Sequence, residues 1–211
     1  MNNTDTTSNG VLHPNQSISG SQSATEVQTV KNSPKSNNNQ NSLETMSNTA
    51  SGNATQGVAG QQTAAQVQGV TNSASSNNTQ NANNVMANTA NGAAHPHGMT
   101  QIIGPSNQHV SQVQLTASSA NSSNSQIGLN NQANNNINSP SKTFQGTSEA
   151  RSVSQGQSNT SSPISINTQL GINNAANTNA NSSNPTSQQL QGNQHLTQGQ
   201  SANSSPNSSS S

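Results

Sequence analysis

His95 and His97, on either side of Pro96, are the residues in this sequence best suited to binding a metal ion. Two imidazoles so close together can hold copper or nickel loosely, and His109 is the next histidine along the chain. The usual zinc spacings, a third nearby ligand and an ordered shell of hydrogen-bonding groups are all missing. We therefore expect no metal site and no cofactor.

Acid–base or nucleophilic catalysis needs reactive groups held about 3 Å apart in a shielded pocket. The four carboxylates, Asp5, Glu26, Glu44 and Glu149, are far apart in the sequence, and each lies in a polar stretch. Nothing in the sequence would hold a serine, a histidine and a carboxylate together. We therefore expect a non-enzymatic protein without catalytic or cofactor-binding residues.

Four serines directly precede a proline, as a proline-directed kinase requires. Lys35 and Lys142 follow two of these steps closely. Phosphorylation would place charge in an almost uncharged chain and oppose self-association. A Ser-Pro step also favours a turn, so the same pattern has a purely structural interpretation. The candidate phosphorylation sites are Ser33, Ser139, Ser162 and Ser205.

The composition argues against a conventional core. Of 211 residues, 125 are Asn, Ser, Gln or Thr, and only 30 are Val, Ile, Leu, Met or Phe. Ordering a residue costs about 1–2 kcal/mol of backbone entropy, and a large buried aliphatic side chain returns roughly 1.5–3 kcal/mol. Apolar burial therefore cannot order this chain. We expect an intrinsically disordered, low-complexity chain, with a repetitive β-solenoid or cross-β assembly as the alternative.

Features that the sequence lacks exclude several classes of binding partner. No stretch has three consecutive large apolar residues, so no membrane insertion is expected. Residues 1–5 show neither the basic nor the apolar part of a secretory signal, and the compartment stays open. Four basic residues and one aromatic, Phe144, offer no nucleic-acid surface. Zero net charge and abundant amides favour attraction between copies, so the expected partner is the chain itself.

The sequence repeats. Residues 19–54 align without gaps on 59–94 with 19 of 36 identities, and 110–145 align on 153–188 equally well. Gly and Val positions align along with the amides, which composition alone does not explain. Replication slippage and a selected stacking unit are both open interpretations. We divide the chain into a disordered tail 1–18, a repeat pair 19–94 of period 40, a His/Pro/Gly linker 95–109, a repeat pair 110–188 of period 43, and a disordered Ser-rich tail 189–211.

Alternating residues predict strands in the second repeat pair. In an extended chain, Ile127, Leu129, Asn131 and Ala133 share one face, and 170–176 repeat the pattern. We expect segments 100–115, 126–136 and 169–179 to start contacts between copies.

A short motif in both repeats resembles the curlin repeat of bacterial biofilm amyloids. In that family, Gln and Asn form ladders along a stacked β-solenoid, which implies assembly roles for the matching residues. This chain departs from the family where the terminal Gln is Ile137 or Ala180, in its longer repeat, and in its lack of aromatics and of a secretion signal. The matching residues are Gln126, Gly128, Asn131 and Ala133, and again Gln169, Gly171, Asn174 and Ala176.

Three functions follow as hypotheses. The first is a repetitive, self-assembling structural protein of a surface, coat, matrix or condensate. The second is a disordered regulatory or interaction tail modulated by phosphorylation at the Ser-Pro sites. The third is a solvating spacer without selected activity.

Overall fold

The protein is a stack of parallel β-strands in two facing sheets, in a computed structural model that describes residues 2–7, 15–51, 55–91, 99–137, 143–180, 186–204 and 207–211. Sheet A contains β1 (Asn2–Thr7), β3 (Lys35–Ser51), β5 (Ser75–Asn91), β7 (Asn121–Ile137), β9 (Ile164–Ala180) and β11 (Asn207–Ser210). Sheet B contains β2 (Asn15–Lys31), β4 (Thr55–Thr71), β6 (Met99–Ala117), β8 (Thr143–Thr160) and β10 (Thr186–Asn203).

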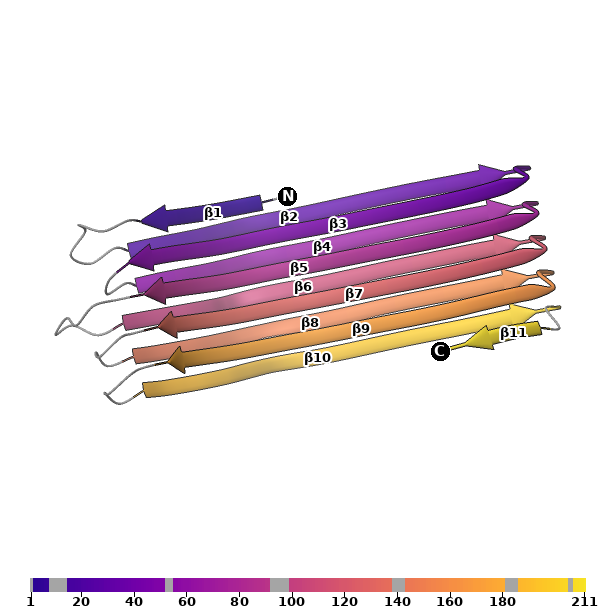
Figure 1. Cartoon of the computed structure of the whole chain (residues 1–211). Coiled ribbons are helices and arrows are strands. Elements are labelled where there is room, and N and C mark those ends of the chain that lie inside the picture. Colours follow the sequence, from indigo (N-terminus) through magenta and orange to yellow (C-terminus); the bar gives the residue numbers. More distant parts are fainter. Residues whose placement is uncertain are drawn as a thin grey trace.

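Consecutive strands alternate between the two sheets, and each strand pairs in parallel with the strand two places further along the chain (Figure 1). One strand of each sheet, joined by a tight corner, makes one coil of a flattened β-solenoid. The first coil is β2 with β3, and the fourth is β8 with β9. The chain is therefore a repetitive parallel-strand protein.

The expectation of an intrinsically disordered chain is wrong for the described residues, and the alternative of a β-solenoid agrees with the structure. Apolar burial is not the only term that offsets chain entropy in this protein. The interior is instead filled mainly by hydrogen-bonded Gln and Asn side chains. Strands also cross the segments that we expected to be tails or a linker: β1 lies within 1–18, β6 begins within 95–109, and 189–211 holds most of β10 and all of β11.

The register follows the sequence repeat. Residues 40 apart face each other between β2 and β4 and between β3 and β5. Residues 43 apart face each other between β7 and β9 and between β8 and β10. Between β5 and β7 the offset is 46. We call residues at equivalent positions on successive strands of one sheet a row.

Outside the register shift in β6, side chains alternate between the interior and the outer surface. In β5, for example, every second residue from Ser76 to Ala90 is buried. Two small apolar clusters interrupt the polar interior. One contains Ile18, Met46, Val58, Met86 and Ile103, and the other contains Ala64, Ala82, Val110 and Val153.

The apolar alternation in the second repeat pair lies on the outer surface of sheet A. Leu170 and Ile172 are 46% and 42% exposed. Ile127 and Leu129 also lie on the outer surface, because the buried residues of β7 are the even-numbered ones, such as Gln126 and Gly128. The sequence pattern thus predicted a shared face, and that face is not the interior.

The tight corners rest on residues in the left-handed conformation. Asn32, Asn72, Ser118, Ser161 and Ser204 have φ between 52° and 55°, a region that Asn adopts more easily than most residues. A serine follows each of the first four, and its hydroxyl can close the corner: in Ser33 and Ser73 it donates to the carbonyl two residues on, at 2.6 and 2.9 Å. These serines are Ser33, Ser73, Ser119 and Ser162.

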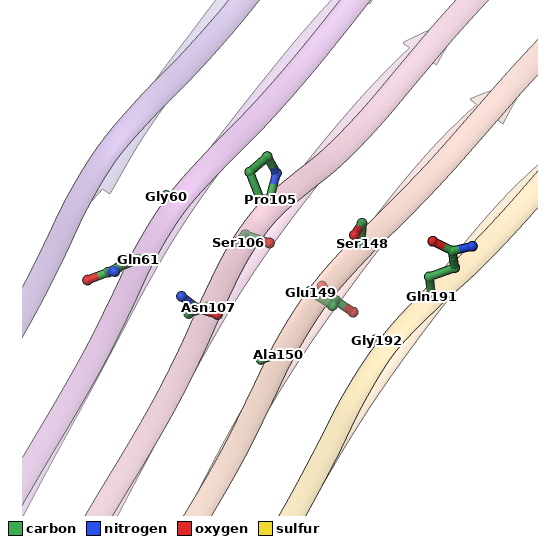
Figure 2. Close-up of a pocket in the computed structure, with 10 residues that line it drawn as sticks. All are labelled: Gly60, Gln61, Pro105, Ser106, Asn107, Ser148, Glu149, Ala150, Gln191 and Gly192. Atoms are coloured by element: carbon green, nitrogen blue, oxygen red, sulfur yellow. The ribbon is translucent and has the colours of Figure 1, made fainter.

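Glycines lie where four of the five strands of sheet B bend, and β8 has Ser148 and Glu149 at the same place. Gly20, Gly60, Gly104 and Gly192 have φ from 130° to 151°, which L-residues rarely adopt. The register also shifts around Gly104 and Pro105 in β6. Figure 2 shows these neighbouring strands side by side, bordering an open hollow of about 640 Å³.

Replacing Gly60 by Ala should lower the free energy of unfolding by at least about 2 kcal/mol, because φ is +135° and the new Cβ would lie 1.9 Å from the Gly20 carbonyl oxygen. Gly57→Ala is the matched control, since its Cβ would meet only Ser17 Oγ, at 3.9 Å. Urea unfolding followed by circular dichroism measures both. Equal midpoints for the two variants would contradict the strained bend.

Candidate assembly interface

Glutamine ladders run through the interior of sheet B. In the first row, each Gln Nε2 donates to the Gln Oε1 of the preceding strand at 2.8–2.9 Å. A second row does the same at 2.8–3.1 Å. The first row is Gln16, Gln56, Gln101, Gln145 and Gln188, and the second is Gln28, Gln68, Gln114, Gln157 and Gln200. A third row begins with Glu26 and continues through Gln66, Gln112, Gln155 and Gln198.

Sheet A carries one glutamine ladder and two complete asparagine ladders across β3, β5, β7 and β9. Their side-chain bonds measure 2.8–3.0 Å. The rows are Gln40, Gln80, Gln126 and Gln169; Asn38, Asn78, Asn124 and Asn167; and Asn48, Asn88, Asn134 and Asn177.

The same amides also join the two sheets. Gln112 Nε2 donates to the Ile127 carbonyl of sheet A at 3.0 Å, and Gln126 Nε2 donates to the Gly156 carbonyl of sheet B at 3.2 Å. In both of these amides, one N–H serves the ladder and the other serves the opposite sheet. Because a buried polar group is costly only when it lacks a partner, amides bonded in this way fill the core without the usual penalty.

The two kinds of ladder run in opposite directions. Gln side chains donate toward the preceding strand, as Gln80 does to Gln40. Asn side chains in the complete rows donate toward the following strand, as Asn48 does to Asn88. The first and last strands of a row therefore present different chemistry to whatever lies beyond them.

Glu44 interrupts one asparagine row at its first strand. It faces Asn84, from which the row continues through Asn130 and Asn173. The carboxyl is buried, and burial raises its pKa above the ordinary value. An ionised carboxyl has no N–H or O–H with which to donate to the next strand.

Glu149 and Arg151 interrupt the interior of β8. They form an ion pair at 2.9 Å, and both side chains are buried. Desolvation raises the pKa of Glu149 to about 7, and the nearby Arg151 opposes that rise. Desolvation likewise lowers the pKa of Arg151. Arg151 occupies the row of Gln22, Gln62 and Gln108, so it ends a ladder that would otherwise reach Gln194.

The two ends of the solenoid are open strand edges. Among the described strands, β2 pairs only with β4, and β10 pairs only with β8. In sheet A, β1 pairs with β3 over Thr45–Ala50, and β11 pairs with β9 over Ile164–Asn167. The ladders therefore end at strands that a further strand can join.

The structure divides the eight residues that resemble the curlin repeat between two faces. Gln126 and Gln169 lie in the interior ladder at 2.9 Å. Gly128 and Gly171 also face the interior, where an added Cβ would come within 2.8 Å of Val153 and 2.3 Å of Leu196. Asn131, Ala133, Asn174 and Ala176 have the opposite parity and lie outside. The residues of β7 that take part in interior ladders are Asn124, Gln126, Asn130 and Asn134.

Of the candidate phosphorylation sites, Ser33 lies partly exposed and Ser162 fully buried, each at a corner. Ser139 and Ser205 lie outside the described residues. The corners give the Ser-Pro steps a structural role, and their phosphorylation stays a prediction.

His95 and His97 also lie outside the described residues, whereas His109 is in β6 with its Nδ1 2.5 Å from Ser152 Oγ. Within the described ranges, no three His, Asp or Glu side chains gather as a metal site. The same ranges hold no long apolar helix of the kind that crosses membranes.

Sequence reasoning missed most of the interior ladders. The available signal was a glutamine spacing of four and then two, repeated along the chain. It occurs at Gln62, Gln66 and Gln68, and again at Gln108, Gln112 and Gln114. Even spacing places all three side chains on one face of a strand.

No protein-family model, curated protein or solved structure matches this chain.

Replacing Glu149 by Ser and Arg151 by Gln together should stabilise the protein at pH 7 by about 1–4 kcal/mol, since a matched polar row replaces a buried ion pair. Ser matches Ser106 in the row of Glu149, and Gln completes the ladder from Gln22 to Gln194. Urea unfolding at several pH values measures this. A double variant less stable than the parent at pH 7 would contradict the prediction.

The parent should lose stability as the pH rises from 4.5 to 7. The folded pKa of Glu149 is raised, so the folded state binds that proton more tightly than the unfolded state, and the advantage disappears above the folded pKa. The double variant should lose this part of the pH dependence. Arg151→Gln alone is the control: it leaves a buried carboxyl without its cation, so its pH dependence should be at least as steep as the parent's.

Proposed function

We propose that this protein is a non-enzymatic structural protein whose folded copies stack end to end into fibres. The observation that carries the proposal is the match between its two open edges. In the interior rows, the last strand of sheet B carries the same residue as the first strand in four rows of eight, and an apolar residue opposite an apolar one in three more. A second copy of the chain is therefore the proposed partner.

The two edges carry few of the features that usually prevent strand addition, and the inward-facing Glu26 of β2 is the exception. Proteins protect edges with short strands, prolines, inward charges or a covering element. Strand β2 has 17 residues and β10 has 18, and neither contains proline. Strand β10 has no charged residue at all, and in β2 only Glu26 and Lys31 are charged. Solenoids without caps at their ends tend to associate.

When β10 of one copy lies beside β2 of the next in the established register, residues of the same kind meet in seven of the eight interior rows, and Gln198 meets Glu26 in the eighth. Gln188 meets Gln16, and Gly192 meets Gly20. The complete set of interior pairs is Gln188 with Gln16, Leu190 with Ile18, Gly192 with Gly20, Gln194 with Gln22, Leu196 with Ala24, Gln198 with Glu26, Gln200 with Gln28, and Ala202 with Val30.

Stacking would also bury apolar surface that the single copy exposes. Leu190 and Leu196 point to the interior side of β10, yet they are 54% and 48% exposed. Beside Ile18 and Ala24 of the next copy they would lie within apolar rows. Each such residue contributes roughly 1–2 kcal/mol when its remaining surface is covered.

Fibre diffraction tests the proposal. Purified protein should first fold and then form fibres with reflections near 4.8 Å along the axis and near 10 Å across it. Leu190→Lys should slow fibre formation at least tenfold, because stacking would bury the charge. Leu115→Lys is the matched control, since Leu115 is 52% exposed on the outer surface of a central strand. Folded protein that stays monomeric at high concentration would refute the proposal.

The row of Glu26 should form the weakest hydrogen bond of each junction between copies. Gln rows donate toward the preceding strand, so β2 of the incoming copy has to donate to β10. Gln16 and Gln28 have N–H groups for this, whereas an ionised Glu26 has none for the Gln198 Oε1. Glu26→Gln should therefore lower the critical concentration for fibres several-fold at pH 7. Sedimentation of aged samples measures it, and an unchanged critical concentration would contradict this assignment of the row.

A further inference from the structure

We propose that adjoining copies share one coil, in which β11 of one copy and β1 of the next copy occupy the same strand position of sheet A, one at each end of it. This inference rests on the proposed end-to-end stacking and specifies its junction. The evidence is that these two short strands occupy different rows of the same sheet.

The pairing places β11 in the first rows of sheet A. Asn207–Ser210 pair with Ile164–Asn167 of β9, and these rows lead back to Lys35–Asn38 of β3. Ser211 continues the pairing, because its N–H donates to the Asn167 carbonyl at 3.0 Å and its own oxygen accepts from the Gln169 N–H at 2.9 Å. The segment therefore fills the rows of residues 35–39.

Strand β1 lies at the other end of the same sheet. Asn2–Thr7 pair with Thr45–Ala50 of β3. The rows of β1 and of β11 do not overlap, and the five rows of residues 40–44 separate them. Figure 1 shows this directly: β1 lies along one half of the stack at the N-terminal end, and β11 along the opposite half at the C-terminal end.

The strand numbers require such a shared coil if the stack is to continue. The described residues of each copy supply five long strands to sheet B, namely β2, β4, β6, β8 and β10. The same residues supply four long strands to sheet A, namely β3, β5, β7 and β9. With β11 and β1 combined, both sheets advance by five strands per copy. When β10 of one copy pairs with β2 of the next, β9 of the first copy and β3 of the next copy lie two strand spacings apart in sheet A. One strand position is therefore left between them, and β11 and β1 occupy it together.

The axial repeat of the fibre distinguishes this junction from others. Five strands at about 4.8 Å give a repeat of about 24 Å per copy. If β1 and β11 instead occupied separate coils, six strand positions per copy would give about 29 Å. Electron cryo-microscopy of the fibres measures the repeat. A value near 24 Å supports the shared coil, and a value near 29 Å overturns it.

Disulfide cross-linking locates each strand of the junction, and the chain has no cysteine of its own to interfere. In each of three pairs of residues, the two residues lie in the same row but four strands apart within one copy, so that about 19 Å separates their Cα atoms. Bridging needs Cα atoms within about 7 Å, so only a neighbouring copy can supply the partner. The pairs are Thr25→Cys with Thr197→Cys for β2 and β10, Asn37→Cys with Ser209→Cys for β3 and β11, and Thr4→Cys with Ala176→Cys for β1 and β9.

Oxidised fibres of all three variants should give ladders of covalent oligomers on non-reducing gels. Thr25→Cys with Asn193→Cys is the control, because Asn193 lies in the row of Ser21, about 13 Å away along the strand, and should not cross-link. Cross-linking of β2 to β10 without the other two pairs would overturn the shared coil and leave end-to-end stacking standing. Failure of the β2–β10 pair would refute the stacking itself.

Discussion

The structure depends on one property of the carboxamide group: it offers two N–H donors and an oxygen acceptor at the tip of a short side chain. Parallel strands lie about 4.8 Å apart, which is the spacing at which stacked amides can bond to one another. Gln112 uses one N–H for Gln66 and the other for the Ile127 carbonyl of the facing sheet. A chain with few large apolar residues can therefore build an ordered interior, provided that equal amides fall in the same row.

This requirement explains why the strands are uniform while the repeat length varies. Strands β2, β3, β4, β5, β7 and β9 all have 17 residues. The offset between coils nevertheless changes from 40 to 46 and then to 43. A residue inserted within a strand would turn every later side chain to the opposite face. An insertion between coils leaves the rows intact, and β6 accommodates one extra residue in the bulge near Gly104.

Parts of this architecture could be read from the sequence. The repeat offsets of 40 and 43 are the offsets of the strand register, and the alternation around Ile127 correctly indicated an extended strand. Disorder was expected because only apolar burial was weighed against chain entropy. The interior face was also missed, since Ile127 and Leu129 suggested an apolar side when the buried residues are Gln126 and Asn130. The Ser-Pro steps suggested modification, and Ser33 and Ser162 lie at corners. Row-by-row pairing is a long-range property that local patterns do not contain.

The opposite directions of the Gln and Asn ladders affect the electrostatics of the stack. Peptide dipoles of an α-helix all point the same way, so their sum grows with length. Here the amide dipoles of the Gln40 row oppose those of the Asn48 row, and strand backbones contribute little net dipole of their own. The Gln rows outnumber the Asn rows, so this opposition is partial and each added coil leaves a net amide dipole along the axis. The two ends of a long stack would therefore differ in hydrogen-bonding chemistry and in the sign of the uncancelled amide dipoles.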